Sequence, residues 1–359
     1  MSTTLTLSPE QLARFNAALR DDKKPDVLLF RILGPQLQLR FTELLDLSGV
    51  PRLLLHGNPH LDNYARTLNG AGLLDFDRSR VGPSLWDVVR ALCSITFWSG
   101  AEQVRPHVEV SACLFNAYQR AIEDRLAYWE APDLLRQVKP KKFQMTSQRY
   151  LKSGKKWVKK LHEHSVEPDE PFYEGLFQSY LESLPEGALS HWELSEVAEV
   201  AGSMGKRHYV YLLSSLTKSR EPILLDIKET YSELDSEHFH NPFEHEGERM
   251  VTASRIYSPG LEERIGFCSY QGEDYWVRQI PSFSAKVPVG IDHDESMQLA
   301  QAIGLQLGRG HRVIDEIYSD GQHKQGLISA VAARRDELIE LSAQLNREVL
   351  DLYEELTRS

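Results

Sequence analysis

Two short stretches of the chain place acidic, amide and imidazole side chains directly after apolar runs. The first is LLLHGNPHLDNY, residues 53–64, and the second is LLDFDRS, residues 73–79. Side chains that follow the ends of two neighbouring strands share a common space. Asn63 and Asp75 would then supply an amide oxygen and a carboxylate, which suit Mg²⁺ together with substrate phosphates. Asn, Asp and Gly also form ordinary turns, so only the joint pattern favours a metal site.

A second pattern in the chain suits a phosphate group. Gly202, Ser203 and Gly205 lie between two predicted strands, and a glycine hairpin lets the backbone approach a phosphate closely. Lys228 follows the apolar run ILLDI, where a lysine must find an anion or reach solvent. A phosphate would satisfy it, as would a helix carboxylate such as that of Glu248. A plain hairpin turn is the alternative explanation for the glycines.

The composition is that of a globular protein. The 359 residues are 41% hydrophobic and 26% charged, enough for one large domain or two smaller ones. Cys93, Cys113 and Cys268 show no metal-binding spacing, so we expect structural thiols. No apolar run approaches the length of a membrane span, and the N-terminus lacks a signal-peptide pattern. We therefore expect a cytoplasmic protein with no membrane partner.

The charge distribution is uneven. A net charge of −11 argues against a general nucleic-acid binder, but residues 136–160 are rich in Lys and Arg and contain no acid. Such a segment would bind polyanions through their phosphates. A solvated basic helix, balanced by acidic surface nearby, explains the same composition equally well.

The pattern of elements changes along the chain. Residues 8–50 read as helical, with Ser8 as the cap and Pro9 in the first turn. Short strands are predicted at 53–55 and 73–74, and helices over 83–98, over 109–129 and on to about 189. Residues 191–282 predict a small antiparallel sheet with one helix, including a hairpin that turns at Gln271–Gly272.

Two long helices are predicted after this sheet, over 296–318 and 326–357. The second would carry an apolar stripe, for which core packing and a coiled-coil contact with a second copy are the two explanations. The stripe consists of Ile328, Val331, Leu338, Leu345, Val349, Leu352 and Leu356.

The order of these motifs resembles two families. HGNPHLDN, LLDFD and GPSLWDVVRAL resemble the aminoglycoside-phosphotransferase branch of the protein-kinase-like fold, with Asn63, Asp75 and Asp87 at its motif positions. The elements FRILGP, GNPHLDNYA, EVAGSMGKRHYVYLL, PILLDIKE, YWVRQI and LGRGH come in the order of an uncharacterised bacterial family, domain of unknown function 2252. This second resemblance covers most of the chain.

The resemblance implies an α+β, bilobal, kinase-like fold in circularly permuted order, because the glycines and lysine follow the catalytic loop instead of preceding it. Residues 1–190 would form a helical part with the catalytic-loop and metal motifs. Residues 191–282 would form a small β-rich part, and residues 283–359 would complete the helical part. Chain permutations of this kind are tolerated where the termini lie close together.

The resemblance also implies roles for these residues in binding ATP, or another nucleoside triphosphate, with Mg²⁺. Asp75 would be the principal metal ligand and Asn63 the second. Lys228 would hold phosphates under the glycine hairpin, and Glu248 would orient Lys228. The expected activity is phosphate transfer to an unknown acceptor.

One position departs from both families. Asn58 stands where they carry the catalytic Asp, and an amide cannot accept a proton. His60, Asp62 and Asp77 are the candidates to replace it. Two alternatives to a kinase follow: a pseudokinase acting as a binding or scaffold module, which Asn58 favours, and a nucleotidyltransferase with the nucleotide bound in reverse.

Overall fold

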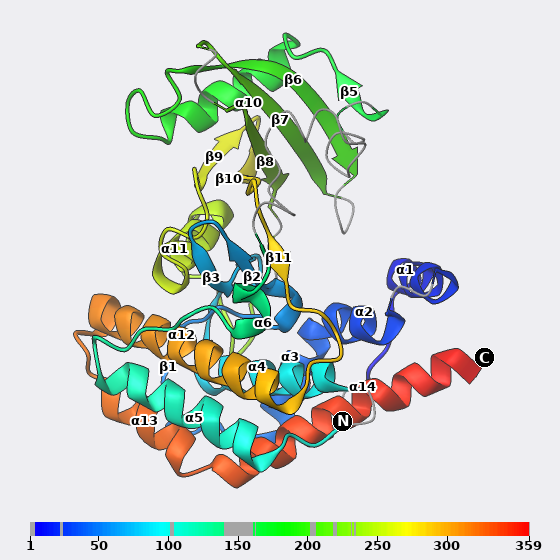
Figure 1. Cartoon of the computed structure of the whole chain (residues 1–359), viewed down its shortest axis with the longest axis vertical. Coiled ribbons are helices and arrows are strands. Elements are labelled where there is room, and N and C mark those ends of the chain that lie inside the picture. Colours follow the sequence, from blue (N-terminus) through cyan, green and yellow to red (C-terminus); the bar gives the residue numbers. More distant parts are fainter. Residues whose placement is uncertain are drawn as a thin grey trace.

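The computed structural model describes residues 4–21, 24–100, 104–139, 161, 163–201, 206–217, 221–230, 232 and 235–358. The helices are α1 (Pro9–Arg20), α2 (Pro25–Ile32), α3 (Gly34–Leu44), η1 (Leu61–Asn63), α4 (Leu85–Ser99), α5 (Val108–Glu123), α6 (Asp133–Arg136), α10 (Pro171–Glu182), α11 (Glu246–Tyr257), α12 (His293–Ser319), α13 (Lys324–Ala332) and α14 (Arg335–Arg358). The strands are β1 (Arg52–Leu54), β2 (Tyr64–Thr67), β3 (Gly70–Leu73), β4 (Val81–Pro83), β5 (Ser165–Val166), β6 (Trp192–Ala201), β7 (Arg207–Ser215), β8 (Ile223–Glu229), β9 (Gly266–Tyr270), β10 (Glu273–Gln279) and β11 (Ala285–Lys286). The fold is α+β, and Figure 1 shows its largest sheet at one end and most helices at the other.

The largest sheet has six strands in the order β5-β6-β7-β8-β10-β9, and each neighbouring pair is antiparallel. Helix α11 comes between β8 and β9 in the chain. Alternate residues point to opposite faces of a strand. On one face, aromatic and aliphatic side chains such as Tyr211 and Leu225 pack against α10. Lys228 belongs to the opposite face.

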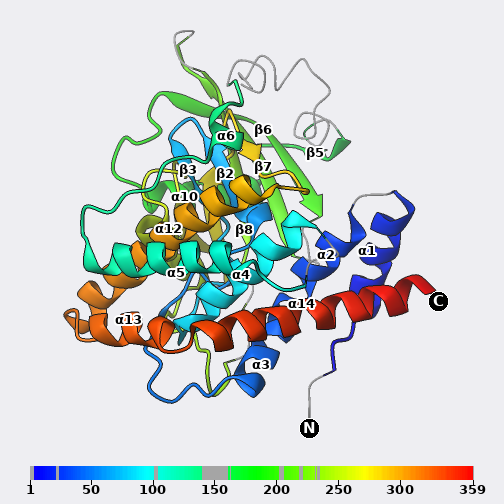
Figure 2. The ribbon, with the colours of Figure 1, turned by 60° about the horizontal axis from the view of Figure 1, so that its bottom comes forward.

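The helical part has one extended hydrophobic core. Its longest helix, α12, runs beside α5 (Figure 2). Close approach of these two helices requires glycine: a Cβ at Gly304 would lie 2.5 Å from the Leu114 carbonyl oxygen, and one at Gly308 would lie 2.2 Å from that of Tyr118. Two smaller sheets are β1-β4 and β11-β2-β3, and the second lies between α12 and the six-stranded sheet in Figure 1.

Several local predictions are confirmed. Helix α1 begins at Pro9, and the Ser8 hydroxyl accepts a hydrogen bond from the Gln11 amide. The β9–β10 hairpin turns at Gln271 and Gly272, which have φ angles of 52° and 85°. The three cysteines are free thiols. These features depend on residues close together in sequence.

Other predictions need correction. The predicted helix over 326–357 is wrong, because the chain forms two helices, α13 and α14, that separate at Ala333 and Arg334. The reason is packing, since α13 lies on α5 whereas α14 lies on α4. Strand β2 occupies part of the predicted loop between the first two strands, and β5 and α10 extend the predicted sheet region before residue 191.

The apolar stripe is therefore divided between two helices. Ile328 and Val331 lie on α13, and Leu338, Leu345 and Val349 are buried within the core of this same chain. Core packing accounts for these positions. None of the helices in the described chain is both long enough and apolar enough to cross a membrane.

Some sequence predictions fall on residues that the structure does not describe. Gly202, Ser203 and Gly205 lie outside the described residues, as does the basic segment apart from residues 136–139.

Candidate functional site

The loop that carries Asn58 and Asn63 is fixed by a buried carboxylate. Asp87, at the start of α4, is fully buried and accepts hydrogen bonds from the amides of His56 (2.8 Å) and Gly57 (2.9 Å). His311 of α12 contacts the same carboxylate at 3.2 Å. Because two backbone donors and an imidazole converge on one side chain, the backbone of the loop has a single defined path.

This loop packs directly against the second motif. Gly57 has a φ of 87°, and a Cβ there would lie 1.9 Å from the Arg78 carbonyl oxygen. Its own carbonyl accepts a hydrogen bond from the Trp86 indole at 2.7 Å. Only glycine can occupy this position, so the residue that precedes Asn58 brings the two motifs into contact.

Asn63 and Asp75 lie at the same end of the β2–β3 hairpin. Tyr64 pairs with Leu73, and the next amide, that of Leu74, donates to the Asn63 carbonyl at 2.8 Å. Asp75 follows with a φ of 69°, a conformation that aspartate tolerates better than most residues. The hairpin thus brings the backbone at Asn63 beside the residue that precedes Asp75.

The charges around Asp75 favour its ionised form. Burial raises the pKa of this carboxyl, but Lys228 and Arg278 outweigh that effect and hold the pKa below its ordinary value. Arg31 and Lys286 act in the same direction. Lys228 and Arg278 come from the six-stranded sheet, so this sheet and the β2–β3 hairpin contribute opposite charges to one region.

On the sheet, the positive charges are organised around Asp226. Its carboxylate is 3.5 Å from both the Lys228 ammonium and the Arg278 Nε, and it also contacts His208. Both cations lie over the ring of Trp276, at 5.2 and 5.0 Å. Although burial raises the pKa of Asp226, Lys228 and His208 lower it well below its ordinary value.

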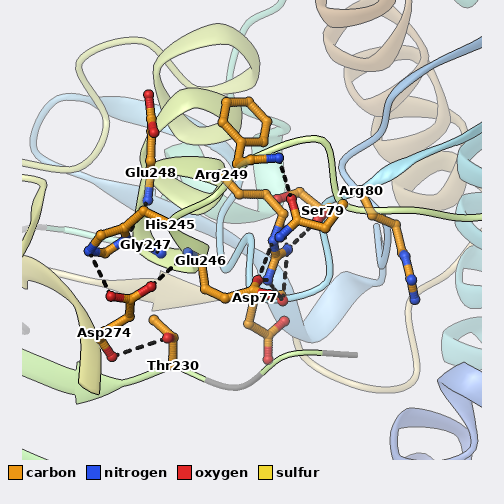
Figure 3. A network of polar contacts seen from close by, with 12 residues as sticks. Asp77, Ser79, Arg80, Thr230, His245, Glu246, Gly247, Glu248, Arg249 and Asp274 are labelled. Atoms are coloured by element: carbon orange, nitrogen blue, oxygen red, sulfur yellow. Dashed lines mark hydrogen bonds and ion pairs between the residues drawn. The ribbon is translucent and has the colours of Figure 1, made fainter. Parts of the chain in front are cut away.

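The partner predicted for Lys228 needs correction. Its ion-pair partner is Asp226, whereas Glu248 is exposed on α11 and its side chain points away from the network in Figure 3. Asp226 is two residues from Lys228 on the same strand, so Lys228 has an acidic partner without a carboxylate from a helix.

Helix α11 instead contributes Arg249. This buried guanidinium donates to the carbonyl oxygens of Asp77 (3.1 Å) and Ser79 and is paired with Glu246 at 2.8 Å (Figure 3). The start of α11 is joined to β10, because the Glu246 amide donates to Asp274 at 3.2 Å. A continuous set of contacts therefore connects the sheet to the segment after Asp75.

Asn58 is buried and its side chain is occupied. Its Oδ1 accepts a hydrogen bond from the Arg90 Nε at 2.9 Å. Arg90 also donates to the Phe30 carbonyl at 3.1 Å and lies 3.9 Å over the Phe30 ring. Burial lowers the pKa of Arg90 to about 9.

The three candidates to replace an aspartate at position 58 lie in different surroundings. His60 is buried beside the Trp98 ring, and burial together with Arg90 and Arg31 lowers its pKa well below the ordinary value. Asp62 is paired with two cations, those of Arg31 and Lys286. Asp77 is half-buried, and its carbonyl accepts from Arg249.

Sequence reasoning missed three charged residues of this region: Arg249, Asp226 and Arg278. Alternation along the strands gave a usable signal for two of them. Asp226 and Lys228 must share a face of β8, and Arg278 on β10 is the residue directly opposite Asp226. No local pattern marked Arg249, because its partners are carbonyl oxygens distant in sequence.

The oxygen donors suit only a metal that is shared with a substrate. Within the part of the chain that the structure describes, no group of three or more His, Cys, Asp or Glu side chains is arranged to hold an ion. One ionised carboxylate with one amide matches the way Mg²⁺ binds through few protein ligands and substrate phosphates.

Comparison with protein families agrees with this chemistry. Residues 2–129 match the model of the phosphotransferase enzyme family, which supports a kinase-like phosphotransferase in general terms. Residues 133–358, more than half of the chain, match the model described as "Uncharacterized protein conserved in bacteria (DUF2252)". The chain belongs to this second family. No curated protein and no solved structure matches it.

Proposed function

We propose that this chain is a phosphotransferase that uses ATP, or another nucleoside triphosphate, with Mg²⁺. The observation that carries the proposal is that Asn63 and Asp75 flank the same end of the β2–β3 hairpin, while Lys228 and Arg278 of the six-stranded sheet are near enough to lower the pKa of Asp75. Phosphoryl transfer depends mainly on positioning and on neutralising phosphate charge. A metal-binding pair opposite two cations supplies both.

The proposed architecture is a bilobal kinase-like fold in circularly permuted order. Residues 191–282 form the small lobe, and residues 1–190 and 283–359 form the helical lobe, with β5 and α10 attached to the small lobe. The strand order β6-β7-β8-β10-β9, with α11 inserted after β8, supports this assignment. The contact between α1 and α14 also supports the permuted order, because permutation needs the first and last helices to lie close together. The rings of Phe15 and Tyr353 on these helices are 6.0 Å apart.

Each residue of the site has a role in this proposal. Asp75 and Asn63 hold the metal, which supplies positive charge to the phosphates when bound. Lys228 contacts the phosphates, and Arg278 adds a second cation; Gly202, Ser203 and Gly205 are proposed from their residue types to contact the same phosphates. The acceptor oxygen forms a bond to the γ-phosphorus as the bond to the bridging oxygen breaks. The diphosphate leaves with that electron pair, and the hydroxyl proton passes to water.

The nature of residue 58 favours one alternative, a pseudokinase that binds nucleotide without transferring phosphate. Asn58 cannot accept a proton, and its oxygen is already bonded to Arg90. Asn58→Asp would place a carboxylate against this guanidinium, which would hold it ionised but weakly basic. For a kinase, general-base help is worth about 10²–10⁴ in rate.

Labelled ATP separates the candidates. Incubation of the protein with Mg²⁺ and γ-labelled ATP should transfer or release the label, and Asp75→Asn should stop this. Transfer of an α-label would indicate a nucleotidyltransferase. Binding without movement of either label, in both wild type and Asn58→Asp, would establish the pseudokinase and contradict the proposal.

A further inference from the structure

Three basic side chains from three separate segments surround the loop that carries Asn58. They are Arg31 on α2, Arg90 on α4 and Lys286 on β11. Among the described residues, Asp62 is the one carboxylate that forms an ion pair within this group, and it is paired with Arg31 and with Lys286. The group, which we call the basic cluster, therefore has more positive than negative charge.

The contacts of Asp62 show how the cluster is held together. One oxygen, Oδ2, is 2.8 Å from the Arg31 Nη1 and 3.3 Å from the Lys286 Nζ. The Arg31 and Lys286 side chains are 39% and 57% exposed, so a molecule from solvent can reach both. A single carboxylate oxygen bridges two accessible cations and leaves most of their hydrogen-bond donors to solvent.

The buried side of the cluster has unused polar atoms. Within the described chain, the Arg90 Nη1, the Arg31 Nε and the His60 Nδ1 have no hydrogen-bond partner. Arg90 and His60 are almost completely buried. Burial lowers the pKa of His60, and Arg90, Arg31 and Lys286 lower it further, so these cations surround a neutral imidazole. Buried polar atoms without partners usually mark a missing ligand or water.

The basic cluster also lies beside the proposed metal site. Arg31 and Lys286 are both paired with Asp62, the residue before Asn63, and Lys286 also pairs with Ala65 on the strand that follows Asn63. An acceptor that approaches the terminal phosphate would therefore meet Arg31 and Lys286. A cationic acceptor such as an aminoglycoside would be repelled there, whereas a carboxylate or phosphate would be attracted.

We infer that the basic cluster is an anion-binding subsite, and that the phosphate acceptor is a small hydroxyl compound carrying a carboxylate or phosphate group. This inference rests on the proposed function. Arg31 and Lys286 bind the anionic group. Asp62 is a positioning residue that holds these two cations together and competes with the ligand for them.

The role of Asp62 predicts the direction in which Asp62→Asn changes the affinity for anions. Asp62→Asn removes the competing charge, so anions should bind more tightly to this variant than to wild type. If Asp62 merely stabilised the loop, the same variant would bind no better or would bind worse. Arg31→Gln and Lys286→Gln should each weaken anion binding about five- to tenfold, because each removes one charged hydrogen-bond donor.

The test is calorimetric titration with glycerol, D-glycerate and glycerol 3-phosphate at constant ionic strength and without nucleotide. Wild type should bind the two anions but not glycerol, and the stronger anion shows whether carboxylate or phosphate is preferred. Arg105→Gln is the matched control, since Arg105 is 57% exposed and paired with Glu340 outside the cluster. It should behave as wild type.

Three results would overturn the inference: no anion binding to wild type, equal binding of glycerol, or anion binding to Asp62→Asn that is no tighter than to wild type. Because these titrations contain no nucleotide, they are independent of the proposed activity. A protein that binds Mg·ATP but shows no preference for anions would keep the proposed function and lose the proposed acceptor class. Anion binding without nucleotide binding would keep the anion-binding subsite but remove both the proposed function and the proposed acceptor class.

Discussion

The loop that carries Asn63 is fixed by backbone amides that donate to a fully buried carboxylate, whereas the sheet residues facing it are joined by ion pairs between side chains. Asp87 holds the loop without any exposed partner. Asp226 holds Lys228 and Arg278, whose side chains are 31% and 21% exposed. The proposed metal side is thus fixed by the fold, and the proposed phosphate side has cations that can adjust to a ligand.

Substitution of Asp87 and of Asp226 should give the largest difference between the loop and the sheet in the free energy of unfolding. Asp87→Ala leaves two buried amides and an imidazole without their acceptor, so the free energy of unfolding should fall by about 3–5 kcal/mol. Asp226→Ala should cost less, about 1–3 kcal/mol, because Lys228 and Arg278 are partly exposed and Arg278 keeps its ion pair with Glu262, so that the main loss is the contact with buried His208. Urea unfolding of both variants measures the difference. Equal losses would contradict the assignment of a rigid side and an adjustable side.

Acid should destabilise the loop side. Burial lowers the pKa of His56 to about 4, and the pKa of His60 is also well below its ordinary value. The unfolded chain therefore binds more protons than the folded chain below pH 6.5, and stability falls as the pH falls. At pH 5 each histidine should cost about 2 kcal/mol.

The pH dependence can be assigned by substitution. Urea unfolding at pH 7.5 and pH 5 should show a smaller difference for His56→Asn and for His60→Asn than for wild type. His293→Asn is the control, because this histidine is 44% exposed and contacts Glu109 at the surface. An unchanged pH slope in both loop variants would mean that other groups cause the acid sensitivity.

Substitution of Arg249 tests the connection between the sheet and the segment after Asp75. Arg249→Lys keeps the charge beside Glu246 but loses the second nitrogen that holds the Asp77 and Ser79 carbonyls. The segment after Asp75 should become less well fixed, and Mg·ATP should therefore bind more weakly to this variant than to wild type. Glu248→Gln, on the same helix but exposed, should bind as wild type. Equal affinity of the two variants would remove the role given to Arg249.

Local signals in the sequence predicted much of the fold. The Ser8 cap, the Gln271–Gly272 turn and the β6, β7 and β8 strands depend on neighbouring residues, and a single sequence contains that information. The separation of α13 from α14 depends on packing against different helices. Ala333 and Arg334 carry no helix-breaking signal, so this boundary was not predictable.

For the candidate site, residue types were more predictable than contacts. The sequence predicted that Asn63 and Asp75 each follow a strand, whereas Asn63 precedes β2 and Asp75 comes after β3, so the two residues flank a hairpin that was not predicted. The bond from Arg90 to Asn58 and the hold of Arg249 on two carbonyls join segments more than 30 residues apart. Such contacts arise only when the chain is folded, and composition gives no sign of them.

The central claim is that Asp75 and Lys228 act on one bound triphosphate from opposite sides. It is tested most directly by calorimetric titration of wild type, Asp75→Asn, Lys228→Met and the double variant with Mg·ATP and with adenosine. Each single variant should lose at least about tenfold in affinity for Mg·ATP and little for adenosine. The double variant should depart from additivity by about 0.5–3 kcal/mol. Unchanged Mg·ATP binding in both single variants, or equal losses for adenosine, would contradict the account.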